Sequence, residues 1–341
     1  MTNTHITAAT AVLMAVAALT ACGPGADSRQ PRKTFIQEVR LTATPVKDQG
    51  RSPLCWVYAV LATIETEHAA QGDSVNLSPD YTARCRLAAL ARRCYLSRGH
   101  EAISLRGMCT TALHLLREQG AMPYDSYHQM QAVNYNALAR RAMLAVRASR
   151  TLADADEAVA RVADNAIGSL PTHVYMFGAE YSPIDFAQSV CRHDEWHAVT
   201  SFTHHPFGKP FRLEVPDNLM DDMFMNVPID SLVERMRHSL RRGHPVCWEG
   251  DISEPGFSWS RGIADIRPGT PVTQQHRQQE FESRRTTDDH CMAITGMARD
   301  AQGRRYFIAK NSWGTGNRYA GYMYLSEDYV RLKTIAVLLH D

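Results

Sequence analysis

The sequence lacks several features that would place a protein in a particular class. Its formal net charge is only +1 over 341 residues, so charge gives no indication of a nucleic-acid or polyanion partner. The sequence shows no internal repeat and no long low-complexity segment. The apolar run near the N-terminus, from about Ala8 to Leu19, is too short to span a bilayer. The 44% of hydrophobic residues are enough to form a full core or two lobes.

The first residues are typical of an export signal. The apolar run ends in Leu19-Thr20-Ala21-Cys22, which resembles a bacterial lipoprotein signal with Cys22 as the lipidated residue. We therefore expect a signal peptide at residues 1–21, and the lipidated cysteine with a polar tether at residues 22–35. An ordinary secretory peptide is the alternative, because residues 1–5 contain no Lys or Arg. In both cases we expect an exported protein; lipidation would anchor it to a membrane on the periplasmic or cell-surface side.

A potential thiol nucleophile stands at a predicted helix start. Ser52 and Pro53 predict an N-cap and a first helical residue, and the apolar-rich residues 56–68 predict that the helix continues. Cys55 would then lie in the first turn, where free N–H groups and the helix dipole favour a thiolate. The N–H of Cys55 and the side-chain amide of Gln49 could donate to an oxyanion. A buried core cysteine is the alternative interpretation.

A predicted hairpin would bring a histidine and an asparagine together. Residues 290–296 and 306–311 are strand-like, and residues 299–303 are typical of a turn. If His290 opposes Asn311, the turn is centred between residues 300 and 301, which agrees with that pattern. Asn311 could then accept from one ring nitrogen while the other faces Cys55, with Trp313 covering the hydrogen bond. A half-buried hairpin with His and Asn at its strand ends is the alternative.

These residues resemble the papain-like cysteine peptidases. The resemblance rests on TPVKDQGRSPLCW at residues 44–56, DDHCMAITG at residues 288–296 and KNSWGTGNRYAGYMYLS at residues 310–326. The middle of the chain is closer to the bleomycin-hydrolase or aminopeptidase C branch, through LSPDY, YSPIDFAQ, NVPIDSLVERM and GHPVCWEGDIS. The resemblance covers about residues 36–335. It implies that Cys55 is the nucleophile, His290 the general base and acid, Asn311 its orienter and Gln49 an oxyanion donor.

The resemblance also implies the architecture and the partners. We expect an α+β, papain-like two-lobe fold in a catalytic domain at residues 36–341. A helical lobe at about 51–165 would carry the nucleophile helix, and a β-rich lobe at about 170–341 would carry the histidine and the asparagine. Within these lobes we expect helices at residues 77–97, 111–119, 137–166, 184–191 and 229–242. We expect a peptide or protein substrate, no nucleic acid, no cofactor and no catalytic metal; the oligomeric state is not predicted.

The sequence departs from the papain pattern at the expected substrate groove. Arg106-Gly107 stands where these enzymes have a Gly-Gly pair, and Ser52-Pro53-Leu54 replaces their Cys-Gly-Ser. We place Arg106, Gly107 and Trp313 at the substrate site. The disulfide that usually links the two segments would be missing, because Ser52 and Ser104 occupy its positions. We also expect no C-terminal arm of the bleomycin-hydrolase type, and therefore an endo- or oligopeptidase, with an aminopeptidase of that type as the alternative.

Two other classes of function remain open. One is a catalytically inactive binding protein on the same fold. The other is a metalloenzyme that uses Cys191, His193, His197, His204 and His205. The zincin motif, however, needs Glu directly after the first His, and Asp194 occupies that place.

Export would permit disulfides among the remaining cysteines. Six of them allow fifteen pairings, and sequence does not choose among these. Cys85 and Cys94 would lie on opposite faces of one helix and roughly 13 Å apart, beyond disulfide reach. Cys247 and Cys291 lie in strand-like runs, where we expect packed thiols.

Overall fold

The computed structural model describes residues 33–129, 133–176 and 178–340. The predicted signal peptide, Cys22 and most of the tether lie outside the described residues. Within the described part, no helix is both long and apolar enough to cross a membrane.

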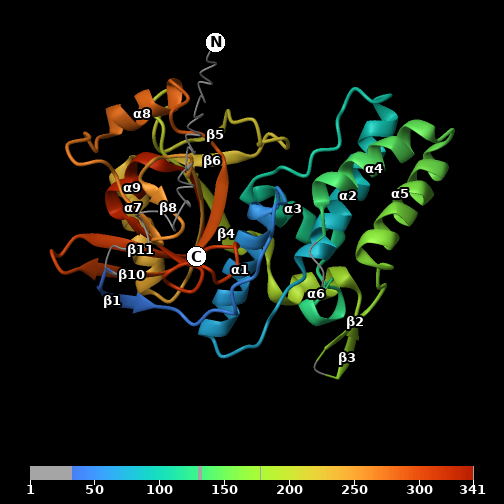
Figure 1. The fold of residues 1–341 in the computed structure, drawn as a ribbon, viewed down its shortest axis with the longest axis horizontal. Helices are drawn as coiled ribbons and strands as arrows, with labels where there is room; N and C mark the ends of the chain where they lie inside the picture. The colour runs from blue at the N-terminus through green and yellow to red at the C-terminus, as the bar shows by residue number, and fades with distance from the viewer. Residues whose placement is uncertain (1–32, 130–132, 177, 341) are drawn as a thin grey trace, which may run out of the picture. The chain divides into compact units, whose positions relative to one another are not determined.

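The helices fall mainly in the first half of the described chain. They are α1 (Cys55–Ala70), α2 (Pro79–Leu96), α3 (Cys109–Gln119), α4 (Tyr135–Ala148), α5 (Leu152–Ile167), α6 (Pro183–Val190), α7 (Ile229–Arg241), α8 (Gln274–Glu282) and α9 (Glu327–Lys333). Figure 1 shows α2, α4 and α5 packed together, with α1 between them and the strands. The predicted helix at residues 56–68 is confirmed as part of α1, and most of its apolar residues from Trp56 to Ile64 are buried.

The strands form a mixed sheet with an antiparallel centre. They are β1 (Phe35–Arg40), β4 (Trp196–Thr200), β5 (Pro210–Arg212), β6 (Met223–Asn226), β7 (Val246–Gly250), β8 (Phe257–Ser258), β9 (Ile263–Ala264), β10 (His290–Asp300), β11 (Arg305–Lys310), β12 (Tyr322–Ser326) and β13 (Thr334–His340). Their order is β5-β6-β4-β13-β7-β10-β11-β12-β9-β8, and β1 pairs with β10. A separate hairpin joins β2 (Val174–Met176) to β3 (Ala179–Tyr181). The predicted α+β fold class is confirmed.

The two larger hydrophobic cores lie on the two sides of the central strands. One includes Leu61 of α1, Leu90 of α2 and Leu116 of α3. The other packs α7 and α9 against the sheet. Helix α7 contributes apolar residues at a spacing of three and four, which places them on one face. They are Ile229, Leu232, Val233, Met236 and Leu240.

The predicted helix boundaries need two corrections. The predicted N-cap at Ser52 is wrong: α1 begins at Cys55, and Leu54 is the N-cap without a side-chain hydrogen bond. The alanine-rich residues 137–166 form two helices rather than one. Helix α4 ends before Ser149, and Thr151 starts α5 with a capping box that it forms with Asp154.

The predicted hairpin exists, but its predicted register is wrong. The prediction placed Ala293 opposite Ile308, whereas Ala293 pairs with Lys310. A bulge between Ile294 and Gly296 shifts the pairing by one further residue. Strand β10 extends to Asp300, whose carboxylate accepts the N–H groups of residues 302 and 304 at 3.0 and 2.9 Å. The turn therefore lies further along the chain than predicted.

Candidate active site

The thiol of Cys55 lies at the positive end of the central helix. Cys55 is the first residue of α1, so its N–H and those of the following turn have no acceptor within the helix. The helix dipole favours a negative charge at this end. Cys55 is partly exposed, while the other residues of the first turn, Trp56 and Val57, are buried. The helix start therefore presents one thiol in an environment that stabilises its anion.

Two residues at the start of β10 act on this thiol. The Cys291 thiol donates a hydrogen bond that lowers the pKa of Cys55. The imidazole of His290 lowers it as well, through a hydrogen bond and through its charge. Burial opposes both effects, but the pKa of Cys55 remains well below the ordinary thiol value. Conversely, burial lowers the pKa of His290, but hydrogen bonds with Cys55 and Asn311 leave it above the usual value. A thiolate and imidazolium pair is thus favoured.

His290 is held from behind by Asn311. The side-chain oxygen of Asn311 lies 2.8 Å from Nε2 of His290 and also accepts the N–H of Ser312 at 2.8 Å. With Nε2 occupied, Nδ1 is the ring nitrogen that faces the thiol. The indole of Trp313 lies over the imidazole, with ring centroids 4.8 Å apart, and shields this pair from water. Asn311 follows directly after the last residue of β11, so the contact forms despite the shifted register.

Gln49 lies next to the same residues. Its backbone N–H donates to the carbonyl of Ser312 at 2.8 Å, and the hydroxyl of Ser312 donates to its side-chain oxygen at 2.6 Å. Its amide nitrogen donates to the carbonyl of Ser52 at 2.8 Å. An amide nitrogen carries two hydrogens, so one further donor remains for a ligand. The loop before α1 is thereby tied to the Asn311 segment.

Sequence reasoning missed an ion cluster that ties these two segments to α1. The buried carboxylate of Glu65 on α1 is paired with Lys47 and lies 3.9 Å from the ammonium of Lys310. It also accepts from the hydroxyl of Thr44, which in turn accepts from Lys310 at 2.7 Å. Burial lowers the pKa of Lys310 to about 8. A glutamate directly after the apolar-rich residues 56–64 of α1 was the available sequence signal.

A pair of buried carboxyl groups also lies near the thiol. Glu249 of β7 and Asp288 are hydrogen-bonded to each other, and the backbone N–H of Cys109 donates to Glu249 at 3.3 Å. Burial raises the pKa of Glu249 to about 7, and burial together with Glu249 raises that of Asp288. The pair therefore keeps a proton near neutral pH, which limits the negative charge that faces Cys55. Glu249 directly follows the apolar residues 246–248, and a carboxylate within such a strand was a usable signal.

The predicted substrate residues Arg106 and Gly107 have partners within the chain. The guanidinium of Arg106 forms two hydrogen bonds with Asp217, at 2.8 and 3.0 Å, and a third with the carbonyl of Asp288 at 3.3 Å. Its charge is thus already balanced. At Gly107, a Cβ atom would come within 3.0 Å of the indole of Trp56. Close packing against the nucleophile helix is a sufficient reason for glycine at this position.

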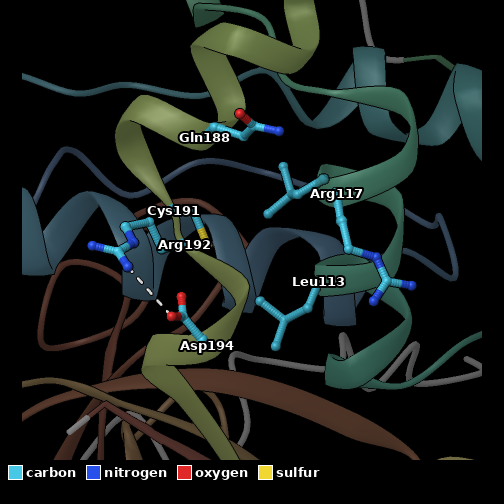
Figure 2. Close-up of a pocket in the computed structure, with 7 residues that line it drawn as sticks. Leu113, Arg117, Gln188, Cys191, Arg192 and Asp194 are labelled. Carbon is cyan, nitrogen blue, oxygen red and sulfur yellow. Dashed lines mark hydrogen bonds and ion pairs between the residues drawn. The ribbon is translucent and has the colours of Figure 1, made fainter.

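The residues of the metalloenzyme alternative whose side chains are described lie in different places, while the side chain of His193 is outside the described part. His197 lines a cavity beside α7 and β13. His204 and His205 both contact Glu214, at 3.0 and 2.7 Å. Cys191 instead lines a pocket of about 370 Å³ between α3 and α6, where Figure 2 shows Arg192 joined to Asp194. Burial raises the pKa of Cys191 to about 12, which makes it a poor ligand or nucleophile.

The seven cysteines within the described residues are all free thiols. The packed thiols predicted at Cys247 and Cys291 are confirmed, since both are buried and unpaired. Cys85 and Cys94, both on α2, are not joined either. Burial raises the pKa of Cys85, Cys109, Cys191, Cys247 and Cys291, whereas that of Cys55 is lowered. Among these thiols Cys55 is the one suited to nucleophilic attack.

The comparisons with known proteins agree with this geometry. Residues 172–340 match the model of the Peptidase C1-like family. The chain belongs to the papain-like cysteine peptidases. The matched residues of this peptidase include His290, Asn311 and Trp313, while Cys55 lies before them. No curated protein sequence matches the peptidase.

Solved structures were also found that are similar to this chain. The peptidase is similar to PepW from Lactobacillus rhamnosis, with a TM-score of 0.72 and 16% identity over 91% of this chain and 82% of that one. At this identity the likeness concerns the fold alone. The bromelain protease of Ananas comosus also matches, with a TM-score of 0.44 and 14% identity over 87% of this chain and 93% of that one.

Proposed function

We propose that the peptidase cleaves internal bonds of extended peptides, with Cys55 as the nucleophile. The observation that carries the proposal is the placement of Cys55 at the helix start, beside His290, which Asn311 holds. A thiolate that is already formed needs no separate base to remove its proton. The remaining amide hydrogen of Gln49 and the N–H of Cys55 are the donors proposed for the oxyanion.

The reaction follows from these positions. The sulfur anion of Cys55 attacks the carbonyl carbon, and the carbonyl oxygen gains negative charge near the N–H of Cys55 and the amide of Gln49. When the C–N bond breaks, the protonated His290 gives its proton to the leaving amine. Water then attacks the thioester while His290 accepts a proton from it. Breakage of the C–S bond releases the carboxylic acid and restores the thiolate.

Cleavage within a peptide needs open space on both sides of the scissile bond. The described C-terminal residues, Thr334–His340, are paired into the sheet as β13. The ring of His340 stacks on His244, whose imidazole lies 2.8 Å from Glu67 of α1. Glu67 is twelve residues after Cys55, roughly 18 Å along the helix. His340 therefore lies far from the thiol, and β13 does not occupy the space beside Cys55.

An aminopeptidase is the second candidate, and the buried carboxyl pair favours it. A substrate ammonium group could be attracted to Glu249 and Asp288, since a nearby positive charge promotes their ionisation. In that case a free N-terminal amine would improve binding. The two candidates thus differ in whether a free N-terminal amine of the substrate improves cleavage.

Kinetics with matched peptides test both candidates. The specificity constant is measured for one peptide with an acetylated and with a free N-terminus, and Cys55→Ala serves as the inactive control. We expect the acetylated peptide to be cleaved at least as well as the free one. Strict dependence on a free amine, lost in Glu249→Gln, would instead establish the aminopeptidase. Equal turnover by Cys55→Ala would refute the nucleophile, and with it both candidates.

We further infer that the peptidase is an exported lipoprotein. The apolar residues 8–19 followed by Leu-Thr-Ala-Cys support this inference. Expression in a bacterium with an alkyne fatty acid should label the wild-type chain and locate it in the membrane fraction. Cys22→Ser should lose both properties. Label retained by Cys22→Ser would refute lipidation at this residue.

A further inference from the structure

A cavity lies at the opposite end of α1 from the thiol. It has a volume of about 760 Å³, and its lining comes from β4, α7 and β13 and from the loop that leads to β7. Four of its lining residues are histidines: His197, His238, His244 and His340. Such a concentration of imidazole groups is a feature of metal sites.

Three donor groups converge beside this cavity. One ligand atom from each of Glu67, His244 and His340 lies within 4.8 Å of the other two. The rings of His244 and His340 are stacked, with centroids 4.9 Å apart. In a tetrahedral site with bonds of about 2.0–2.1 Å, donor atoms lie roughly 3.4 Å apart. Binding of one ion would therefore draw these three donor atoms closer together.

A buried oxygen of Glu67 is the second observation that points to a ligand. Its Oε1 has two partners, Nδ1 of His244 at 2.8 Å and the amide nitrogen of Gln71 at 3.1 Å. Its Oε2 is buried without any hydrogen-bond partner, in a side chain that is only 7% exposed. An unsatisfied carboxylate oxygen in such a place is unfavourable. A bound cation would satisfy it.

We propose that Glu67, His244 and His340 bind one divalent transition-metal ion, with Zn²⁺ as the best fit. Two imidazoles and one carboxylate match the nitrogen and oxygen ligands of Zn²⁺, whereas Mg²⁺ and Ca²⁺ prefer oxygen alone. The cavity lets water complete the coordination. Because the three ligands come from α1, β13 and the residue two before β7, the ion joins the nucleophile helix to two strands of the sheet.

The other histidine cluster provides a matched comparison. His204, His205 and Glu214 also bring three donor atoms together, but their hydrogen bonds oppose metal binding. The side-chain oxygen of Gln278 accepts the N–H of Thr203 at 2.7 Å, so its amide nitrogen donates to Nδ1 of His204 at 2.9 Å. The proton of His204 must then be on Nε2, which faces Glu214. Both oxygens of Glu214 are already used.

Metal titration of the full chain tests the proposal. Cys55→Ala is used as the parent protein, because a Cys–His pair can itself bind Zn²⁺. After treatment with a chelator, Zn²⁺ is added in a calorimeter, and bound metal is counted by plasma mass spectrometry after gel filtration. We expect one equivalent per chain. We also expect Tm to rise by about 4 °C when free Zn²⁺ is about 100-fold above Kd.

Variants connect the binding to these residues. Glu67→Gln and His340→Ala, each in the Cys55→Ala parent, should lose the bound equivalent and the rise in Tm, while His204→Ala with His205→Ala should keep both. Circular dichroism checks that each variant is folded. His340 is the last residue of β13, so His340→Ala is the variant least able to disturb the core. Absence of stoichiometric Zn²⁺ in the parent, or its retention in His340→Ala and Glu67→Gln, would overturn the proposal. Neither result depends on peptidase activity.

Discussion

Removal of the Cys291 thiol should shift the pH at which Cys55 becomes reactive. The hydrogen bond from Cys291 is the largest contribution that lowers the pKa of Cys55. The Cys291→Ala variant lacks this donor, while His290 remains. A hydrogen bond to a charged group is worth about 1.5–3 kcal/mol, and a thiol is a weak donor, so the lower end applies. Since about 1.4 kcal/mol corresponds to one pKa unit, the pKa of Cys55 should rise by about one unit.

The sign of the change can be followed in a pH profile. The thiolate and imidazolium pair exists above the lowered pKa of Cys55 and below the raised pKa of His290. The reactivity of Cys55 therefore rises as pH passes the pKa of Cys55 and changes again as pH passes the pKa of His290. In Cys291→Ala the acidic side should move to higher pH by about one unit.

Alkylation by iodoacetamide is a direct assay, because the reagent reacts with the thiolate. The rate constant is measured from pH 3 to pH 9, and peptide mapping verifies that Cys55 carries the label. Cys291→Ser keeps a donor and should retain the wild-type profile. Cys247→Ala is the matched control, because the thiol of Cys247 forms its hydrogen bond with Thr63. An unchanged or lower acidic limb in Cys291→Ala would refute the reasoning.

Three further predictions concern the surrounding groups. Gln49→Ala should lower kcat by roughly a hundredfold with little change in KM, because its amide acts on charge that develops in the transition state. Asn311→Ala should lower kcat by roughly tenfold to a hundredfold, and His290→Ala by a thousandfold or more, because Asn311 only orients the ring. The pKa of Glu249 is raised to about 7 in the folded protein, so the folded state holds this proton more tightly than the unfolded chain. The resulting stabilisation is complete below the ordinary carboxyl pKa and is lost as pH rises through about 7. Between pH 5 and pH 8 the wild type should lose up to about 3 kcal/mol more unfolding free energy than Glu249→Gln, measured by urea denaturation.

One result would contradict each of these three predictions. A change in KM alone would mean that Gln49 only binds substrate. Equal losses for Asn311→Ala and His290→Ala would assign more than orientation to the asparagine. Parallel pH dependence in Glu249→Gln and the wild type would show that this carboxyl does not titrate in the range.

Local pattern was sufficient for some parts of the active site. Cys55 falls in the first turn of α1 even though the predicted N-cap at Ser52 is wrong, because the apolar run after it determines where a helix forms. His290 and Asn311 meet although their predicted register is wrong. A turn between two strand-like runs is enough to bring them near each other, while the register depends on the bulge after Ile294 and on the hydrogen bonds of Asp300.

The sequence by itself therefore determined the fold class, the helix that carries Cys55 and the hairpin near which His290 and Asn311 lie, because each depends on residues close together in the chain. Only the tertiary structure decided which groups surround the thiol. Cys291, Glu249 and Asp288 act on one another through burial and pairing between strands. Glu67 of α1 converges with His244 and His340, although His244 lies 177 residues later in the chain and His340 lies later still. No local pattern encodes such contacts, because they depend on how β7, β10 and β13 are ordered beside α1.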